Sequence, residues 1–300
     1  MVNNTRILLL GSSGQIGWEL ARTLMPVGHV IAPERSQFDL ANPATLTTLI
    51  DASQPHVIVN AAAYTAVDKA EHETSLAMTV NGRAPGVLAT AACRHGALLV
   101  HYSTEYVFDG AKTGAYSEAD APSPGSAYGR SKLSGEEAVR AAGADHLIFR
   151  TSWVYAARGK NFLRTILRLA GEREELRVVA DQFGAPTWAR LIAEVTALTL
   201  HKELARRESG ESGSGTFNLT AAGDTTWHGF ASAIVAAARA RGARLKCRAV
   251  VPITTAEYPL PAPRPANSRL SGAKLAQRYA LEMPGWDCCM QLCLAELFSS

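Results

Sequence analysis

One stretch decides the fold: Leu8-Leu9-Leu10-Gly11-Ser12-Ser13-Gly14-Gln15-Ile16-Gly17, in which an apolar run meets the start of a helical pattern. Its glycines follow the spacing G-x-x-G-x-x-G. Glycine lets the backbone turn sharply and come close to a pyrophosphate, and the following helix presents free N–H groups and a positive dipole end to that anion. The stretch therefore predicts a strand, a dinucleotide-binding turn and a helix. A tight turn that binds no ligand is the alternative.

The first half of the chain alternates short apolar runs with helical patterns. We expect strands at residues 6–10, 29–32, 56–60, 97–102 and 146–150, and helices at residues 14–24, 43–52, 75–95 and 127–142. Strands that alternate with helices form right-handed βαβ units and a parallel sheet. Runs that are apolar throughout fit strands covered on both faces. The predicted fold class is therefore α/β, a doubly wound parallel sheet of the Rossmann type.

The second half is less regular. Residues 161–170, 187–201 and 226–241 have helical patterns, and residues 208–215, rich in Gly, Ser and Glu, predict a surface loop. Five prolines between residues 252 and 267 predict an extended loop. We expect a dinucleotide-binding domain over residues 1–155. Residues 156–300 would form a smaller, mainly substrate-binding region that is interleaved with the first domain.

Composition excludes several classes of function. The chain has 300 residues, of which 47% are hydrophobic and 19% charged, as in a globular protein with a core. Its net charge of +3 is too weak to indicate nucleic-acid binding. No apolar run approaches the roughly 20 residues that cross a membrane, and the first run, residues 7–10, is too short for a secretory segment. The five cysteines lack zinc-like spacing, so we expect reduced thiols and a cytoplasmic protein without nucleic-acid or membrane partners.

The second expected strand ends near Glu34 and Arg35, which bear on the choice of cofactor. An acid at this point binds the ribose 2′-hydroxyl of NAD, whereas a basic residue holds the 2′-phosphate of NADP. Because both are present, we expect the protein to use either NADH or NADPH. The other expected cofactor contacts are Gly11, Gly14, Gln15, Ile16 and Gly17 in the loop, Asp39 and Leu40 near the adenine, and Ala62, Ala63, Tyr64 and Thr65 after the third strand. For Asp39 and the alanines, simple helix flanking and helix packing are the alternatives.

The motif Tyr128-Gly129-Arg130-Ser131-Lys132 lies in an expected helix. The i, i+4 spacing puts Tyr128 and Lys132 on one face of that helix. A free phenol has a pKa of about 10, and a nearby ammonium lowers it towards the range in which acid–base catalysis works. The same lysine can bind the ribose of the cofactor. By itself this pair is weak evidence, because any surface helix can carry it by chance.

Two hydroxyl residues, Ser103 and Thr104, follow the fourth expected strand and should lie at the carboxyl edge of the sheet. A hydroxyl at this edge can donate a hydrogen bond to a substrate carbonyl, although either residue could simply cap the strand. The order of glycine loop, Ser/Thr and Tyr-x-x-x-Lys, each on the appropriate element, predicts an oxidoreductase that transfers hydride from a nicotinamide. Its catalytic residues would be Tyr128, Lys132 and one of the hydroxyl residues Ser103 and Thr104.

This order of motifs resembles the extended short-chain dehydrogenase/reductase family. Five stretches extend the resemblance to one branch of that family: residues 60–71, 101–108, 149–155, 181–187 and 264–269, of which the last three are specific to the branch. The resemblance implies reduction of the C4 ketone of dTDP-4-dehydro-6-deoxy-L-mannose to dTDP-L-rhamnose, a sugar donor for bacterial surface polysaccharide such as the O-antigen of lipopolysaccharide. Tyr128 would protonate the oxyanion, Lys132 would tune Tyr128, and Thr104 would bind the sugar.

The same resemblance suggests further substrate contacts. Trp153 would line the sugar pocket, since an aromatic face suits the apolar face of a deoxysugar; a core tryptophan is the alternative. Arg264 and Arg269 are candidates for the substrate diphosphate, because guanidinium groups bind phosphate oxygens in a bidentate way; surface salt bridges are the alternative. Glu105 stands where the family usually has Asp, and we keep it as a candidate substrate contact.

A metal and a second subunit also follow from the resemblance. Some members form a homodimer bridged by Mg²⁺ through glutamates, and Glu19 and Glu296 match two of those positions. The third position is Arg190, and a cation among carboxylates neutralises them without a metal. We therefore expect the Mg²⁺ site to be absent or weakened, with an ion pair from Arg190 in its place, and no metal at the catalytic site.

Two other functions stay open. One is another nucleotide-sugar enzyme of the same family, an epimerase or a dehydratase, which would use the same Tyr/Lys pair. Dehydratases of this kind have an acid pair beside the threonine, whereas Thr104 is followed by a single Glu105 and then Tyr106. The other is a non-catalytic regulatory subunit that binds a dinucleotide and a partner protein. The joint presence of Thr104, Tyr128 and Lys132 favours catalysis.

Overall fold

A six-stranded sheet lies at the centre of the protein in the computed structural model, which describes residues 5–211 and 213–299. Its strands run in the order β10-β5-β4-β3-β1-β2, and every neighbouring pair is parallel. Their bounds are β1 Arg6–Leu10, β2 His29–Ile31, β3 Val57–Asn60, β4 Leu98–Thr104, β5 His146–Thr151 and β10 Gly215–Asn218. This is the doubly wound α/β arrangement that the sequence predicts.

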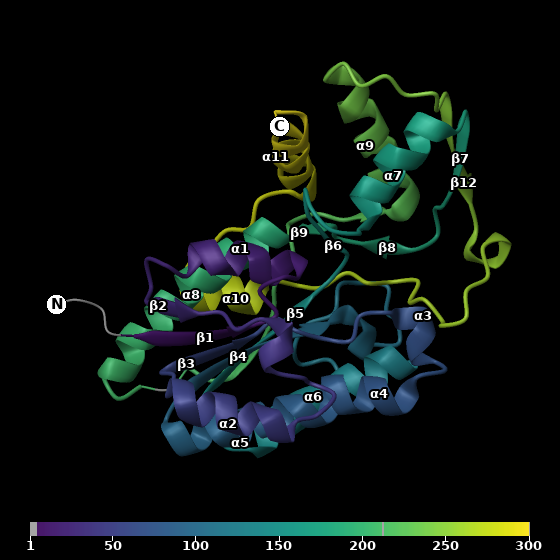
Figure 1. The fold of residues 1–300 in the computed structure, drawn as a ribbon. Helices are drawn as coiled ribbons and strands as arrows, with labels where there is room; N and C mark the ends of the chain where they lie inside the picture. The colour runs from purple at the N-terminus through teal and green to yellow at the C-terminus, as the bar shows by residue number, and fades with distance from the viewer. Residues whose placement is uncertain (1–4, 212, 300) are drawn as a thin grey trace.

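Helices cover both faces of the sheet (Figure 1). One face carries α1 Gln15–Thr23, α8 Ala189–Glu208 and α10 Ala273–Tyr279, and the other carries α2 Ala44–Ser53, α5 Ala84–His95 and α6 Ala127–Ala141. Because strand side chains alternate between faces, β1 buries Ile7 and Leu9 in one core cluster and Leu8 and Leu10 in the other. This explains why the strand is apolar throughout.

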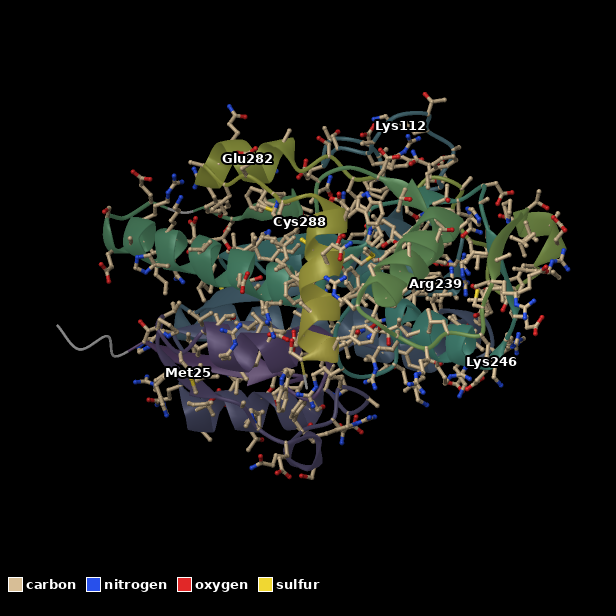
Figure 2. All side chains as sticks on the ribbon, turned by 90° about the horizontal axis from the view of Figure 1, so that it is seen from above. Met25, Lys112, Arg239, Lys246, Glu282 and Cys288 are labelled. Carbon is tan, nitrogen blue, oxygen red and sulfur yellow. The ribbon has the colours of Figure 1, made fainter. Side chains whose placement is uncertain are left out.

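The second lobe packs three helices against short strand pairs, at the upper right of Figure 1. The helices are α7 Phe162–Glu172, α9 Trp227–Ala240 and α11 Trp286–Phe298. The strand pairs are β6 Val154–Tyr155 with β9 Thr187–Trp188, β7 Glu175–Val179 with β12 Ala249–Ile253, and β8 Phe183–Gly184 with β11 Thr225–Thr226. Seen from above in Figure 2, α11, marked by Cys288, crosses next to α9, which carries Arg239. Since β10 comes from the second half of the chain, both halves contribute to the central sheet.

The single helix expected at residues 75–95 is divided. Its parts are α4 Thr74–Met78, a π-helical turn over Thr79–Arg83, and α5. The buried Asn81 explains the turn: its side chain accepts from the Tyr64 backbone N–H and donates to the Tyr64 carbonyl, both at 2.9 Å. The extra residue in the turn aims Asn81 at the loop that follows β3, which helical periodicity alone does not reveal.

The prediction of two loops in the second half of the chain is also partly wrong. Within residues 252–267, the first two residues belong to β12, where Pro252 lies opposite Val178 of β7, and Thr255–Glu257 forms a 3₁₀ turn. Proline is tolerated there because each strand of a two-stranded sheet has a free edge. The expected loop at 208–215 loses residue 208 to α8 and residue 215 to β10, and residue 212 lies outside the described residues. Within the described ranges, no helix is both long enough and apolar enough to cross a membrane.

Candidate active site

The glycine loop lies at the switch point of the sheet, where β1 has β2 on one side and β3 on the other. Gly11 has a φ of +84°, and a Cβ there would lie 2.7 Å from the backbone nitrogen of Ala62. A Cβ on Gly17 would lie 2.0 Å from the Gly11 carbonyl oxygen. Both positions therefore require glycine. The open backbone and the α1 N-terminus, with Gly14 as its cap, fit the pyrophosphate of a dinucleotide.

The other expected cofactor residues surround this loop. Gln15 and Ile16 begin α1, Ala63 and Thr65 are exposed just after β3, and Leu40 is buried beneath the loop that follows β2. Glu34 and Arg35 are both exposed, with Glu34 capping the 3₁₀ turn Arg35–Gln37. The Asp39 carboxylate accepts from the Ala41 backbone N–H at 2.9 Å. That contact is the local turn that we kept as the alternative, so an adenine contact by Asp39 stays a prediction.

Helix α6 begins beside the end of β4 and is capped from two directions. The Ser126 hydroxyl accepts from the Gly129 N–H at 3.1 Å, and the Glu71 carboxylate accepts from the Ala127 N–H at 2.8 Å. Because both contacts lie in the first turn, they fix the position of Tyr128. The Tyr128 ring makes an edge contact with the Tyr106 ring, with centroids 5.5 Å apart.

The buried Thr104 and Glu105 form a polar cluster with the partly buried Tyr128. The Thr104 hydroxyl donates to Glu105 Oε2 at 2.7 Å, and only 4% of each of these two residues is exposed. Burial raises the pKa of Glu105 to about 7. Burial and the Glu105 carboxylate also raise the pKa of Tyr128, while its hydrogen bond with Thr104 lowers it. We expected Lys132 to lower the pKa of Tyr128, and the shift has the opposite direction because burial outweighs the other effects.

Lys132 lies deep at the same end of the sheet, with 2% of the residue exposed. Its ammonium donates to the Tyr102 carbonyl at 2.6 Å, and Nζ lies 3.4 Å from Nε2 of His101. Burial lowers the pKa of Lys132 to about 8, and Glu136 opposes that shift. Ser103 is buried on the same strand. The contact with His101 has no signal in the sequence beyond a polar residue in an otherwise apolar strand.

Trp153 is more enclosed than the sequence suggests. Its indole stacks on Trp227 of α9, with centroids 3.6 Å apart and planes 11° apart. A Cβ on Gly184 would lie 2.6 Å from the Trp153 ring, so β8 also presses on the indole. The φ of Trp153 is +49°, a left-handed value that tertiary contacts must hold in place. Trp227 covers one face of the indole, and a sugar contact by Trp153 stays a prediction.

The two candidate arginines are paired within the protein. Arg264 donates to Asp68 at 2.7 Å. Its positive charge lies close enough to Tyr106 to lower the pKa of that phenol. Arg269 donates to the Asn267 side chain at 2.8 Å and to the Thr113 carbonyl at 2.7 Å. The structure therefore brings Arg264 towards the catalytic cluster. Binding of a diphosphate by either arginine stays a prediction.

Glu19, Arg190 and Glu296 meet on the opposite face of the sheet from α6. Arg190 Nε lies 3.1 Å from Glu19 Oε2, and Arg190 Nη2 lies 2.8 Å from Glu296 Oε2. This is the ion pair expected at Arg190. The guanidinium lies between the two carboxylates, so these residues do not fit a Mg²⁺ site. Across residues 5–211 and 213–299, no three His, Cys, Asp or Glu residues gather as a metal-binding group.

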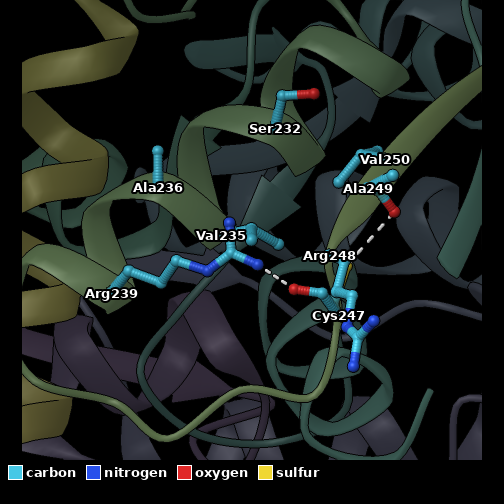
Figure 3. Close-up of a pocket in the computed structure, with 8 residues that line it drawn as sticks. All are labelled: Ser232, Val235, Ala236, Arg239, Cys247, Arg248, Ala249 and Val250. Carbon is cyan, nitrogen blue, oxygen red and sulfur yellow. Dashed lines mark hydrogen bonds between the residues drawn. The ribbon is translucent and has the colours of Figure 1, made fainter. Parts of the chain in front are cut away.

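A small hollow of about 180 Å³ lies elsewhere, between α9 and β12 (Figure 3). Arg239 donates to the Cys247 carbonyl across it, and Cys247 Sγ lies 3.3 Å from the Ala249 carbonyl. It is smaller than the roughly 300 Å³ at which ligand pockets begin, and no residue expected at the active site lines it. The hollow is therefore not a candidate for the cofactor or the sugar nucleotide.

A doubly wound sheet, a glycine loop at its switch point and a Tyr-x-x-x-Lys helix beside it together define a nicotinamide-dependent oxidoreductase of the extended short-chain dehydrogenase/reductase class. The chain matches the RmlD substrate binding domain family over residues 5–299 and belongs to that family.

Relatives and solved structures agree with this assignment. The dTDP-4-dehydrorhamnose reductase of Burkholderia thailandensis is 54% identical over 296 residues, which cover 98% of this chain and 99% of that protein. The enzyme of the same name from Escherichia coli K12 is 44% identical over 298 residues, 98% of each chain. The crystal structure of dTDP-4-dehydrorhamnose reductase from Bacillus anthracis in complex with NADP superposes with a TM-score of 0.87, at 33% identity, over 98% of this chain and 99% of that one.

Proposed function

We propose that the protein reduces the C4 ketone of dTDP-4-dehydro-6-deoxy-L-mannose to give dTDP-L-rhamnose, using NADPH or NADH. The observation that carries this proposal is the polar cluster of Thr104, Glu105 and Tyr128 at the carboxyl edge of the sheet. The cluster lies in a chain that is 54% identical to an enzyme named for this reduction. When bound, the nicotinamide supplies hydride to the ketone carbon.

The side chains supply the proton and the orientation. The raised pKa of Tyr128 keeps its phenol protonated at neutral pH, as a donor to the C4 oxyanion must be. Thr104 aligns the ketone by turning its one hydroxyl proton from Glu105 to the same oxygen when the ketone binds. Lys132, within the same helix, replaces the proton that Tyr128 gives up. Trp153, Glu105, Arg264 and Arg269 are the proposed contacts to the rest of the sugar nucleotide.

Assembly and location complete the proposal. We place the reaction in the cytoplasm and propose a homodimer without a bridging Mg²⁺, because Arg190 already neutralises Glu19 and Glu296. The exposed Glu34 and Arg35 support the use of both NADH and NADPH.

The direct test is to incubate the purified protein with the 4-keto sugar nucleotide and each reduced cofactor, and to identify the product by NMR. We expect dTDP-L-rhamnose with both cofactors, in amounts equal to the cofactor oxidised. An epimerase or dehydratase would instead retain NAD through purification and consume no added cofactor. A regulatory subunit would consume none and form no product. Turnover with one cofactor alone would contradict the proposal of dual use.

A further inference from the structure

A line of three buried polar side chains leads from β3 to the catalytic helix. Asn60 of β3 and His101 of β4 are register partners on neighbouring strands, and only 1% of each is exposed. Asn60 Nδ2 lies 3.2 Å from Nδ1 of His101, and the other ring nitrogen, Nε2, lies 3.4 Å from Nζ of Lys132. Neither Asn60 nor His101 has a role in the reaction described above.

The backbone fixes the direction of the hydrogen bonds along this line. The Ala62 N–H can only donate, and its partner at 3.3 Å is Oδ1 of Asn60. The amide nitrogen of Asn60 therefore faces His101, and because Nδ2 can also only donate, Nδ1 of His101 must accept. Burial lowers the pKa of His101 well below its usual value, so the ring is neutral. Its one proton is then on Nε2, facing Lys132.

This arrangement distinguishes between the two protonation states of Lys132. An ammonium has three N–H donors and no acceptor, so it cannot accept from Nε2–H of His101. A neutral amine has a lone pair that can. The Tyr102 carbonyl, 2.6 Å from Nζ, accepts an N–H in either state. The Asn60–His101 pair therefore stabilises the amine and opposes the ammonium.

We propose that Asn60 and His101 are positioning residues that favour the neutral amine of Lys132 over its ammonium, so that Lys132 can return a proton to Tyr128. This inference rests on the proposed reduction. Once Tyr128 has given its phenolic proton to the C4 oxyanion, one N–H bond of the Lys132 ammonium breaks and the O–H bond of Tyr128 re-forms. The amine left on Lys132 accepts from Nε2–H of His101 until a proton from solvent restores the ammonium.

The charged groups around Lys132 agree with this role. Glu136, one turn further along α6, favours the ammonium, but it is paired with Arg150 of β5 at 2.7 Å. Glu105 acts on Tyr128 from the other side. Burial is the larger effect on Lys132 and brings its pKa to about 8. The lysine can therefore gain and lose its proton near neutral pH.

The test exchanges Asn60 for an isosteric group that only accepts. In Asn60→Asp, the carboxylate draws the ring proton of His101 to Nδ1, and the Nε2 lone pair then faces the ammonium. Reduction requires the proton on Lys132, so kcat should fall as pH rises through the pKa of Lys132, near 8 in the wild type. We expect this alkaline limb to move up by about one pH unit, the equivalent of one hydrogen bond. His101→Asn, which keeps a polar group facing Asn60 but none facing Lys132, should shift it in the same direction.

A second readout does not depend on activity. ¹⁵N NMR of the cofactor-free protein, labelled at histidine, identifies which ring nitrogen of His101 carries the proton. We expect Nε2 in the wild type and Nδ1 in Asn60→Asp. The control is His146→Gln, at the far end of β5, where Nδ1 of His146 lies 2.9 Å from the Ala144 carbonyl oxygen. This variant should leave the alkaline limb of the kcat profile at the wild-type pH.

The outcomes separate the two proposals. A wild-type protein that does not reduce the 4-keto sugar nucleotide overturns the proposed function, whatever the state of His101. An active wild type whose alkaline limb stays in place in both Asn60→Asp and His101→Asn overturns the inference. So does a wild-type His101 with its proton on Nδ1.

Discussion

Glu105 and Tyr128 share one polar site, in which the Glu105 carboxylate raises the pKa of Tyr128. Glu105 is uncharged below its pKa of about 7, because burial disfavours the carboxylate. Above that pH its negative charge lies next to Tyr128, where the reaction builds up negative charge on the substrate oxygen. An anion at that position opposes the transition state. For the proposed reduction, we therefore predict that the neutral acid is the active form of Glu105.

The pH dependence of kcat/KM tests this coupling, since it reports the ionisations of the free enzyme. We expect kcat/KM to decline as pH rises through about 7 in the wild type. Glu105→Gln, which stays neutral and keeps an acceptor for Thr104, should lose that decline. The later decline of kcat, assigned to Lys132, should remain in the variant. A decline near pH 7 that persists in Glu105→Gln would exclude Glu105 as its source.

Single residues also show where sequence reasoning stops. Gly11 and Gly17 can be predicted because the turn itself requires them: Gly11 has a positive φ, and Gly17 packs against the Gly11 carbonyl. Tyr128 and Lys132 can be predicted because they are one helical turn apart. The contact between Asn60 and His101 depends on the register of two strands that are 41 residues apart. Trp153 packs against Trp227 and Gly184. Helix and strand periodicity give no sign of these contacts, because they join separate parts of the chain.

At the scale of elements, the start of α6 matters more than its length. The Glu71 carboxylate binds the Ala127 N–H at the helix N-terminus, directly before Tyr128. An acceptor at this position satisfies an N–H that has no partner within the helix, and its charge complements the helix dipole. Glu71, which follows the short helix α3 Val67–Ala70, therefore helps to place Tyr128, the proposed proton donor.

Replacement of this cap should cost both stability and rate. We expect Glu71→Ala to lower the free energy of unfolding by about 1 kcal/mol, the usual effect of losing a helix cap. It should also lower kcat several-fold, because Tyr128 follows the freed N–H. Denaturant unfolding and steady-state kinetics measure the two effects. Glu137→Ala, on the exposed side of the same helix, is the matched control. If Glu71→Ala and Glu137→Ala have the same free energy of unfolding and the same kcat, Glu71 does not act as a helix cap.

Most elements can be predicted because their burial patterns are local, and the misses come from contacts between distant parts of the chain. The π-helical turn at Thr79–Arg83 exists because Asn81 satisfies the Tyr64 backbone, a partner 17 residues away. Strand β12 forms around Pro252 because β7 needs a partner on one side only. In both places, a tertiary contact overrides the preference of the segment.

At the scale of the whole molecule, the C-terminal helix α11 is tied back to the first helix. Arg190 of α8 binds Glu19 of α1 and Glu296 of α11, so three distant parts of the chain meet at one guanidinium. Glu19 is 5% exposed, so loss of the cation would leave a nearly buried carboxylate beside another one. The arginine thus links α1 and α8 to the C-terminal helix α11.

Addition and removal of Mg²⁺ test whether Arg190 takes the place of a metal between Glu19 and Glu296. We expect the Tm of the wild type to be the same in millimolar Mg²⁺ and in EDTA. Arg190→Glu should lower Tm, because three carboxylates then repel one another, and Mg²⁺ should recover part of the loss. Arg190→Gln should lower Tm without any recovery by Mg²⁺. A wild-type Tm that rises with Mg²⁺ would contradict the account.

In the proposed reaction, Tyr128 protonates the sugar oxyanion during hydride transfer. The most direct test is NADPH oxidation on addition of the 4-keto sugar nucleotide, compared between the wild type, Tyr128→Phe and a control variant. The control is Tyr258→Phe, at a residue that is 55% exposed. We expect Tyr128→Phe to lose at least about a hundredfold in kcat, the lower range for loss of a general acid, with cofactor affinity nearly unchanged. Tyr258→Phe should match the wild type. Near-wild-type turnover by Tyr128→Phe would contradict the assignment of the proton donor.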